Sequence, residues 1–276
     1  ETGFHLNLMS SENYNEWNSI LKTTGTYNLL KNKKYTNIKI VNFMLRDKKN
    51  PNNILKLISK VRLNARKSRV SLTKDVWESI NSFWLFLNES LNKNILEKEL
   101  DNLIKNLKMN LALIFGFIHK TMLRNEILNF CFLGTFLERF DNTLRILNAK
   151  FFRSPDNKNY NHKSDLQLEL ILRSISSYRS FMWKYQNIIN EKSMSSFLIF
   201  DKTMPKSLVF CINEILDNLK LISRSNSRSF KKAKIIKNKI LLLKIFNNSN
   251  FHNILNELID LNIKLGETIE EDFNFH

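Results

Sequence analysis

The chain of 276 residues carries 43 Lys and Arg against 26 Asp and Glu, and its formal net charge is +17. It contains only five Gly and three Pro, and this scarcity of helix-breaking residues argues against a sheet protein and predicts an all-α fold. No uncharged apolar run reaches the roughly 18 residues that a membrane-spanning helix needs, so we expect no membrane segment.

Signals for helix starts and apolar faces follow one another along the first half of the chain. Ser10–Ser11 can cap a first helix, and Asn52–Asn53 can open another after the turn that contains Pro51. Ser71 or Thr73 can cap the helix after that. We expect helices over residues 10–21, 54–65, 73–87 and 95–118. Residues 35–45 form an apolar segment between the first two of them.

A continuous apolar stripe marks a long central helix over residues 121–147. Its members follow alternating steps of three and four residues and are Phe130, Leu133, Leu137, Phe140, Leu144 and Leu147. Further apolar residues on the other faces predict that neighbouring helices enclose this helix. Glu138 and Arg139 lie inside it, and Arg139 shares its azimuth with Phe132 and Ile146. Because an unpaired buried charge is costly, we expect both charges to be paired or hydrogen-bonded.

The second half of the chain contains a polar loop and further helices. The loop covers residues 154–162 and contains Pro155, and Ser164–Gln167 then has the pattern of a capping box. Pro205 is predicted to lie in the first turn of the helix that follows it. We expect the last two helices over residues 230–246 and 250–265. Gly266 should end the second of them.

Two blocks of sequence recur in the same order in the two halves. The matching pairs are residues 42–54 with 196–208 and, upstream, residues 20–23 with 171–174. In the first pair Phe, Asp, Lys and Pro coincide without a gap at an offset of 154 residues, and in the second the offset is 151. The recurrence predicts a tandem duplication of a helical unit of about 150 residues.

The duplication predicts how the chain is organised. Residues 1–118 form the first repeat and residues 119–276 the second, and we expect them to pack about a pseudo-two-fold axis as one compact helical bundle. Continuing the register backwards places the counterpart of Glu138–Arg139 ahead of Glu1. The first repeat is therefore expected without its N-terminal helix.

The two cysteines, Cys131 and Cys211, both fall in apolar helical patterns. We expect buried free thiols in a cytosolic protein rather than a disulfide. Two cysteines without nearby histidines make a poor metal site, and the chain has no metal-ligand spacing, no phosphate-binding glycine loop and no Ser-His-Asp arrangement with local support. We therefore expect neither a metal nor a cofactor.

Two interpretations are open for Glu138 and Arg139. Arg139 could hold a carboxylate or phosphate through two hydrogen bonds while Glu138 orients it or a substrate amine. Alternatively, the two residues form buried ion pairs that fix how the repeats dock. Neighbouring residues on a helix point about 100° apart, so each should pair with another helix rather than with the other. Asp141 and Arg145, four residues apart, are expected to form a surface ion pair.

A cluster of polar residues follows the Asn-Pro turn in the first half. Arg62 and Arg66 lie one helical turn apart on one face, with Asn64 between them in sequence. This spacing suits either an anionic ligand or intramolecular carboxylates such as Glu78. Arg62, Asn64 and Arg66 are therefore candidates, together with Glu138 and Arg139, for a ligand or ion-pair site.

A smaller polar group precedes the central helix, and a basic run lies near the C-terminus. Arg124 and Glu126 lie beside His119, which has no nucleophile or second base spaced to support a role as general base. The basic run could grip an acidic partner or nucleic acid, or could be a solvated helix face. Its members are Arg224, Arg228, Lys231, Lys232, Lys234, Lys237 and Lys239. Phe230 alone is interleaved with them, which does not support stacking on bases.

Several ordered motifs over nearly the whole chain resemble those of the bacterial alpha-E family. The motifs are Asn50–Ile54, Arg62–Arg66, Trp77–Asn81, Thr121–Met122 with Arg124 and Glu126, Leu133–Gly134 and Leu137–Asp141. That family is an all-helical domain named for a Glu-Arg motif and usually duplicated in tandem. The chain departs from its pattern at Thr135, where the family often has Arg, and at Glu126–Leu128, where it has Glu-Gly-Trp.

The resemblance implies a cytoplasmic protein encoded beside circularly permuted ATP-grasp ligases. We therefore expect a non-catalytic accessory or partner protein of a peptide synthesis or modification system, which binds the ATP-grasp protein, its peptide substrate, or both. Two alternatives are an enzyme that acts on a peptide or amino acid at Glu138, Arg139 and Arg62, and a basic helical protein associated with nucleic acid.

Overall fold

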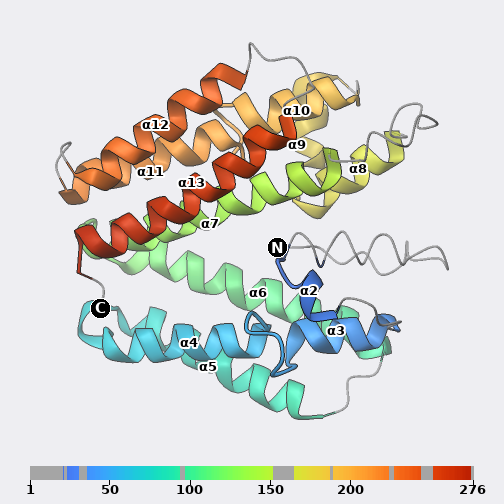
Figure 1. Cartoon of the computed structure of the whole chain (residues 1–276). Coiled ribbons are helices and arrows are strands. Elements are labelled where there is room, and N and C mark those ends of the chain that lie inside the picture. Colours follow the sequence, from blue (N-terminus) through green and yellow to red (C-terminus); the bar gives the residue numbers. More distant parts are fainter. Residues whose placement is uncertain are drawn as a thin grey trace. The chain divides into compact units, whose positions relative to one another are not determined.

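The computed structural model describes residues 21, 24–30, 36–93, 97–151, 165–186, 189–223, 227–243 and 251–274. These residues form twelve α-helices and no strand, which confirms the predicted all-α fold (Figure 1). The chain divides into two compact units. Unit 2 is Gly25–Leu128, and unit 1 is Asn129–His276 together with Leu21 and Thr24 from the N-terminal segment. The repeat boundary after residue 118 stays a prediction.

Five whole helices lie in the described part of unit 2. They are α2 (Tyr27–Leu30), α3 (Asn37–Leu45), α4 (Ile54–Lys67), α5 (Lys74–Asn92) and α6 (Glu97–Thr121), with the 3-10 turn η2 (Arg69–Ser71) before α5. Asn53 caps α4 as expected, because its side chain accepts a hydrogen bond of 2.8 Å from the backbone N–H of Lys56. α5 packs against both α4 and α6. Its buried apolar face provides much of the core of unit 2 through Val76, Ile80, Phe83, Leu87 and Leu91.

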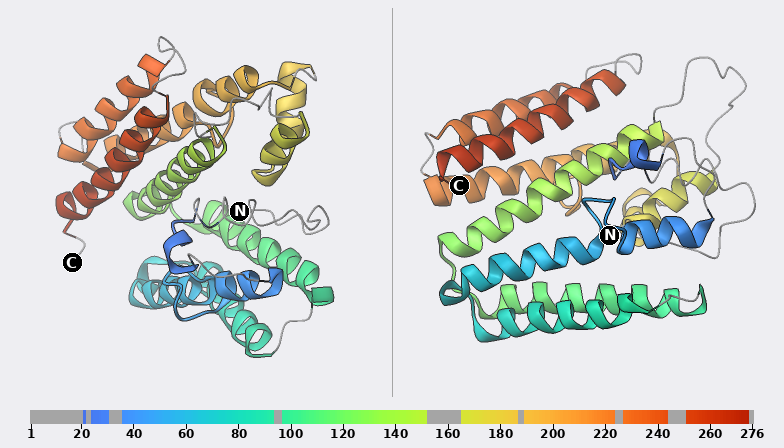
Figure 2. Two further views of the ribbon diagram at one scale, coloured as in Figure 1. Left: turned by 45° about the vertical axis from the view of Figure 1, so that its right-hand side comes forward. Right: turned by 60° about the horizontal axis from the view of Figure 1, so that its bottom comes forward.

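Seven of the described helices belong to unit 1. They are α7 (Glu126–Phe151), α8 (Asp165–Ser174), α9 (Tyr178–Tyr185), α10 (Glu191–Phe200), α11 (Leu208–Ser223), α12 (Arg228–Leu242) and α13 (Phe251–Asp272). The first of them, α7, starts three residues before the unit boundary at Asn129. α12 packs against both α11 and α13, and the short α8, α9 and α10 lie together beside them (Figure 2). One apolar core joins side chains from all these elements.

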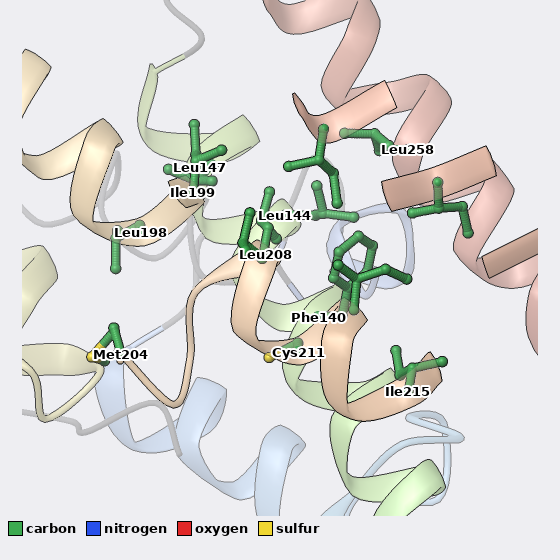
Figure 3. Close-up of a cluster of buried hydrophobic side chains, with 14 of the residues drawn as sticks. Phe140, Leu144, Leu147, Leu198, Ile199, Met204, Leu208, Cys211, Ile215 and Leu258 are labelled. Carbon is green, nitrogen blue, oxygen red and sulfur yellow. The ribbon is translucent and has the colours of Figure 1, made fainter. Parts of the chain in front are cut away.

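The apolar stripe of α7 faces the core of unit 1, as predicted. Leu133, Phe140, Leu144 and Leu147 are fully or almost fully buried, and Phe130 and Leu137 pack at the edge of the same core. Figure 3 shows Phe140 and Leu144 beside side chains of α11. Burying four large side chains of one helix supplies several kcal/mol of favourable free energy, so α7 contributes substantially to the stability of unit 1.

Hydrogen bonds from polar side chains fix α7 along its neighbours. The hydroxyl of Thr143 donates to the backbone carbonyl of Lys206 at 2.7 Å, just before α11. The side-chain amide of Asn262 on α13 donates to the carbonyl of Leu137 at 3.4 Å. These contacts at separate points set the register of α7 on both α11 and α13.

The loop geometry of the first half recurs in the second. α3, α4, α5 and α6 begin 154 residues before α10, α11, α12 and α13 respectively. The carboxylate of Asp47 accepts from the backbone N–H of Lys49 at 2.9 Å, and that of Asp201 accepts from the N–H of Thr203 at 2.8 Å. Both pairs are the same short Asx turn. This match supports the predicted duplication, which itself stays a prediction.

Two predictions about helix ends were wrong. Pro205 lies in the turn before α11 rather than in its first turn, because Ser207 caps the helix by accepting from the backbone N–H of Phe210 at 3.0 Å. Gly266 does not end the last helix, since α13 continues to Asp272. Beyond Gly266, Ile269 still packs into the core, and this burial outweighs the helix-ending preference of glycine. The predictions for residues 10–20, residues 154–162 and Ser164 fall outside the described residues.

The turn between α10 and α11 contains one acid, Asp201, and its carboxylate is buried. Its side chain is 1% exposed, and it pairs with the ammonium of Lys184 on α9 at 2.6 Å. Burial alone would raise the pKa of Asp201, but hydrogen bonds from Lys184 and Thr203 and the positive charge of Lys184 outweigh it and hold that pKa below its usual value. The pair therefore ties α9 to the turn that begins α11.

We expect Asp201→Ala to lower the free energy of unfolding by about 2 kcal/mol at neutral pH, since hydrogen bonds to a charged group are lost. The matched control is Asp47→Ala at the more accessible turn, which should cost less than about 1 kcal/mol. Because the folded pKa of Asp201 is lowered, its contribution is present above the unfolded Asp pKa and is lost as pH falls through the folded value. Denaturant unfolding at several pH values measures both effects. Equal losses in the two variants would contradict the assignment.

Candidate functional site

Glu138 lies on the solvent side of α7. The exposed stripe Gly134, Glu138 and Asn142 is opposite the buried one, and the Glu138 carboxylate accepts from the Asn142 side chain at 3.3 Å. The expectation that the interior encloses both charges was therefore wrong for Glu138. A helix turns by 100° per residue, so residues one and two positions before Phe140 cannot both share its face. Glu138 needs no buried partner because water solvates it.

Arg139 lies at the edge of the core, between α7 and α11. Its side chain is half-buried, and the guanidinium carbon stands 5.4 Å from the centre of the Phe136 ring. That ring in turn packs against Phe210 of α11, with 6.0 Å between the ring centres. In the part of the chain that the structure describes, no carboxylate forms an ion pair with Arg139. Its hydrogen-bond donors are thus held in place on one side by an aromatic face while their polar edge stays available.

Two residues of α11, Cys211 and Glu214, feel the charge of Arg139. Burial raises the pKa of the Cys211 thiol to about 12, and Arg139 only partly opposes that shift. Burial and the neighbouring charge of Asp217 raise the pKa of Glu214, again against the effect of Arg139. Sequence reasoning missed Glu214. The spacing of Cys211 and Glu214 puts them on one helix face, but only the packing of α7 on α11 shows that Arg139 lies there.

Asp141 and Arg145 form the predicted ion pair along α7, with 2.5 Å between the Arg145 Nε and an Asp141 oxygen. The side chains are 29% and 18% exposed for Arg145 and Asp141, so the pair is partly shielded from water. The second carboxylate oxygen of Asp141 is buried and has no hydrogen-bond partner among the described residues. Asp141 is thus two residues along α7 from Arg139 but is already engaged by Arg145.

The candidate arginines of α4 belong to a separate group in unit 2. Arg62 donates to the side-chain carbonyl of Asn81 at 2.8 Å and lies 4.0 Å from the centre of the Trp84 ring. Glu78 pairs instead with Lys74 at 3.7 Å, so the alternative in which Glu78 pairs with these arginines is not what the structure shows. Lys74 lies one helical turn before Glu78 on α5, a spacing that favours this pair.

The remaining candidate residues belong to unit 2 and are exposed. Asn64 and Arg66 are exposed on α4, and Asn64 contributes its carbonyl to the end of the helix by accepting from Ser68 at 3.0 Å. Arg124 donates to the His119 carbonyl at 2.8 Å, where it closes the end of α6. Glu126 stands exposed in the first turn of α7, where a negative charge favours the helix dipole.

Part of the basic run on α12 serves the contact with α13. Arg228 pairs with Asp272 at 2.8 Å and with Glu271 at 3.3 Å, and Lys239 pairs with Glu257. These side chains neutralise acids of the neighbouring helix. Lys231, Lys232 and Lys234 are exposed, as a solvated helix face would have them, and Arg224 lies outside the described residues. The two paired side chains make the capacity of the run for an external polyanion smaller than its length implies.

The described residues contain no group of three His, Cys, Asp or Glu side chains placed to hold a metal ion. Among the same residues, no helix combines the length and apolarity that crossing a bilayer requires. Both cysteines are free thiols, Cys211 buried and Cys131 half-buried. The group with the clearest chemical capacity is Arg139 over Phe136, a positioned guanidinium suited to one carboxylate or phosphate.

The chain matches a family described as a predicted alpha-helical domain with a conserved ER motif, Alpha-E, over residues 2–273. Glu138–Arg139 is the Glu-Arg sequence of this chain, and it lies in the helix that supports the core of unit 1. The chain therefore belongs to the Alpha-E family. Comparisons with curated proteins and with solved structures found no match.

We expect Arg139→Met to lower the free energy of unfolding by about 1 kcal/mol or less, because only the contact with the Phe136 ring is lost. Phe140→Ala, in the next position but fully buried, should cost about 3–5 kcal/mol. The loss of positive charge should also raise the pKa of Glu214 further. Denaturant unfolding and NMR titration of the Glu214 carboxyl measure the two effects. A cost for Arg139→Met as large as that for Phe140→Ala would show that Arg139 holds the fold through a buried ion pair.

Proposed function

We propose that the protein is a non-catalytic accessory protein of a cytoplasmic, ATP-grasp-linked system of peptide synthesis or modification. In this proposal Arg139 binds a carboxylate of the peptide substrate or of the partner protein. The observation that carries the proposal is the guanidinium of Arg139, which is half-buried over an aromatic ring and forms no ion pair with any described carboxylate. The link to an ATP-grasp protein follows from the resemblance of the motifs to the alpha-E family.

The environment of Arg139 favours a single carboxylate over a polyanion. A guanidinium with a free edge binds a carboxylate through two parallel hydrogen bonds. Glu214 and Asp217 lie on the neighbouring face of α11, and their negative charges would repel further phosphates of a nucleic acid. One negative group is balanced by Arg139, whereas a chain of them is not. A peptide end or an acidic side chain therefore suits the site better than RNA or DNA.

The chemistry around Arg139 supports binding more than catalysis. Cys211 is the nearby group with a nucleophilic atom, and the pKa of about 12 that burial produces keeps it in the unreactive thiol form at neutral pH. A bound amine could contact the carboxyl of Glu214, whose pKa is raised. Among the described residues, however, no second acid or base is hydrogen-bonded to that carboxyl as a catalytic partner. The enzymatic alternative thus has no observation of its own.

We expect Arg139→Met to weaken binding of the ATP-grasp protein that this proposal takes as the partner, or of its peptide substrate, by about 10- to 100-fold, the value of lost charged hydrogen bonds. Arg139→Lys should recover only part of the affinity, because an ammonium cannot make the bidentate contact. Co-purification and isothermal titration with the full chain measure these effects.

The matched control is Arg173→Met. Arg173 also lies over an aromatic ring, 4.1 Å from the centre of that of Tyr178, but it is engaged by Glu169 at 2.6 Å. This variant should bind as the unchanged chain does. Unaltered binding by Arg139→Met would refute the site, and failure of the unchanged chain to associate with the ATP-grasp protein would refute the partner.

A further inference from the structure

One side of the α4–α5 pair in unit 2 carries two rows of polar and aromatic side chains. α4 packs against α5, and within each row the residues lie three or four positions apart, so each row follows one face of its helix. The members are Ser59, Arg62 and Arg66 on α4 and Trp77, Asn81 and Trp84 on α5. Contacts between the two rows fix the orientation of Arg62.

Arg62 is held in place by two contacts with α5. Its Nε donates to the side-chain carbonyl of Asn81 at 2.8 Å, and its guanidinium carbon lies 4.0 Å from the centre of the Trp84 ring. The Trp84 indole is itself fixed, because its N–H donates to the hydroxyl of Ser59 at 3.1 Å. A hydrogen bond and a ring face therefore set the plane of the guanidinium before any ligand binds.

The outer edge of the Arg62 guanidinium has no partner within the described part of the chain. There, neither Nη1 nor Nη2 forms a hydrogen bond, and no carboxylate forms an ion pair with Arg62. α4 contains five basic residues and no acid, and Glu78 of α5 is engaged by Lys74. The two terminal nitrogens of a fixed guanidinium present parallel N–H donors, which match two oxygens of one anionic group.

Two further arginines add positive charge beside Arg62. Arg66 lies one helical turn farther along α4, and the guanidinium carbon of Arg69 in η2 lies 5.2 Å from the centre of the Trp77 ring. Both arginines are exposed, and no acid among the described residues pairs with either. Three positive charges within roughly 10 Å along the helix suit a ligand that concentrates several negative charges in a small volume.

Unit 1 has none of these side chains at the corresponding positions. At the offset of 154 residues, the counterparts of Arg62, Asn81 and Trp84 are Leu216, Ile235 and Asn238. α11 and α12 pack as a pair without them, so helix packing does not require the arginine, the amide or the indole. Ile235 and Asn238 are exposed although α7 is in place in unit 1. A helix placed like α7 therefore does not cover this side of α12.

We propose that Arg62, Arg66 and Arg69 form a binding site for a compact phosphorylated ligand that carries a diphosphate or a longer phosphate chain. Arg62 binds one phosphate through Nη1 and Nη2, and the other two arginines bind the next phosphate. One carboxylate would leave two of the three positive charges unbalanced. The site residues are not those of the proposed carboxylate-binding site, so this inference does not depend on the proposed function.

The extent of the arginine cluster favours a compact ligand over a nucleic acid strand. Roughly 10 Å along the helix corresponds to about three phosphates of a DNA strand, at 3.4 Å each. Proteins that bind single strands contact about 4–16 nucleotides per domain and stack bases on free aromatic faces. Here the Trp84 ring already has the Arg62 guanidinium over it, and the Trp77 ring has that of Arg69.

The experiment is isothermal titration of the full chain with pyrophosphate, and with succinate at the same ionic strength. Pyrophosphate should bind at least about tenfold more tightly than succinate. Arg62→Met should weaken pyrophosphate binding at least about tenfold, and Arg62→Lys should recover only part of the affinity. Asn81→Asp should also weaken it severalfold, because a carboxylate in place of the amide would engage Arg62 within the chain. Asn81 is in this sense a positioning residue.

The matched control is Lys60→Met. Lys60 is exposed on the same helix, about 160° around it from Arg62, so this variant removes one positive charge without touching the cluster. It should bind pyrophosphate as the unchanged chain does, and thermal melting of every variant checks folding.

Four results would overturn the proposal. The first is that folded, unchanged protein shows no saturable binding of pyrophosphate, and the second is that succinate binds as tightly. Equal losses in Lys60→Met and Arg62→Met would show that only the net charge of α4 matters. The fourth is a single-stranded RNA oligonucleotide that binds through Arg62 and is not displaced by pyrophosphate, because the ligand would then be a polynucleotide.

Discussion

The packing of the apolar stripe of α7 against α11 and α13 is the contact on which unit 1 depends. It buries Phe140 and Leu144 and seals Cys211 and Leu265 of the neighbouring helices. Helical geometry then determines the other faces. The side opposite the core presents Glu138 to water, and the side between them brings Arg139 to the edge of α11. The positions of both residues of the Glu-Arg motif thus follow from one hydrophobic contact.

The burial and contacts of Arg139 bear on the two interpretations of that motif. A fully buried guanidinium would require an ion pair, but a half-buried one over an aromatic ring can keep its polar edge hydrated. Arg139 is of the second kind, and its charge only partly opposes the burial and the Asp217 charge that raise the pKa of Glu214. The half-buried guanidinium over the Phe136 ring is the feature on which the proposed carboxylate-binding role of the motif rests. Glu138 lies on the outer face of α7, about 100° around the helix from Arg139.

The two units have similar local structure and different surfaces. The Asx turn at Asp47 recurs at Asp201, and four helices begin at the same offset, so the backbone framework is shared. Arg62, Asn81 and Trp84 of unit 2 are matched by Leu216, Ile235 and Asn238 in unit 1. A framework depends on turn chemistry and apolar periodicity, which tolerate many side chains, whereas a contact depends on the particular side chains at its centre. The units therefore differ in what they can bind.

The sequence by itself determined the all-α class, most helix positions, the core stripe of α7, the Asp141–Arg145 pair and the family, because these depend on residues close together in the chain. It also showed the recurring turn at Asp47 and Asp201. Only the tertiary structure placed Glu138 in solvent, brought Glu214 and Cys211 to Arg139, and brought Arg62 to Asn81 and Trp84. Gly266 and Pro205 show the same limit, since core packing and a competing cap outweighed their local preferences. Contacts between distant segments depend on how helix faces meet, and periodicity shows that a face is apolar without showing which other face it meets.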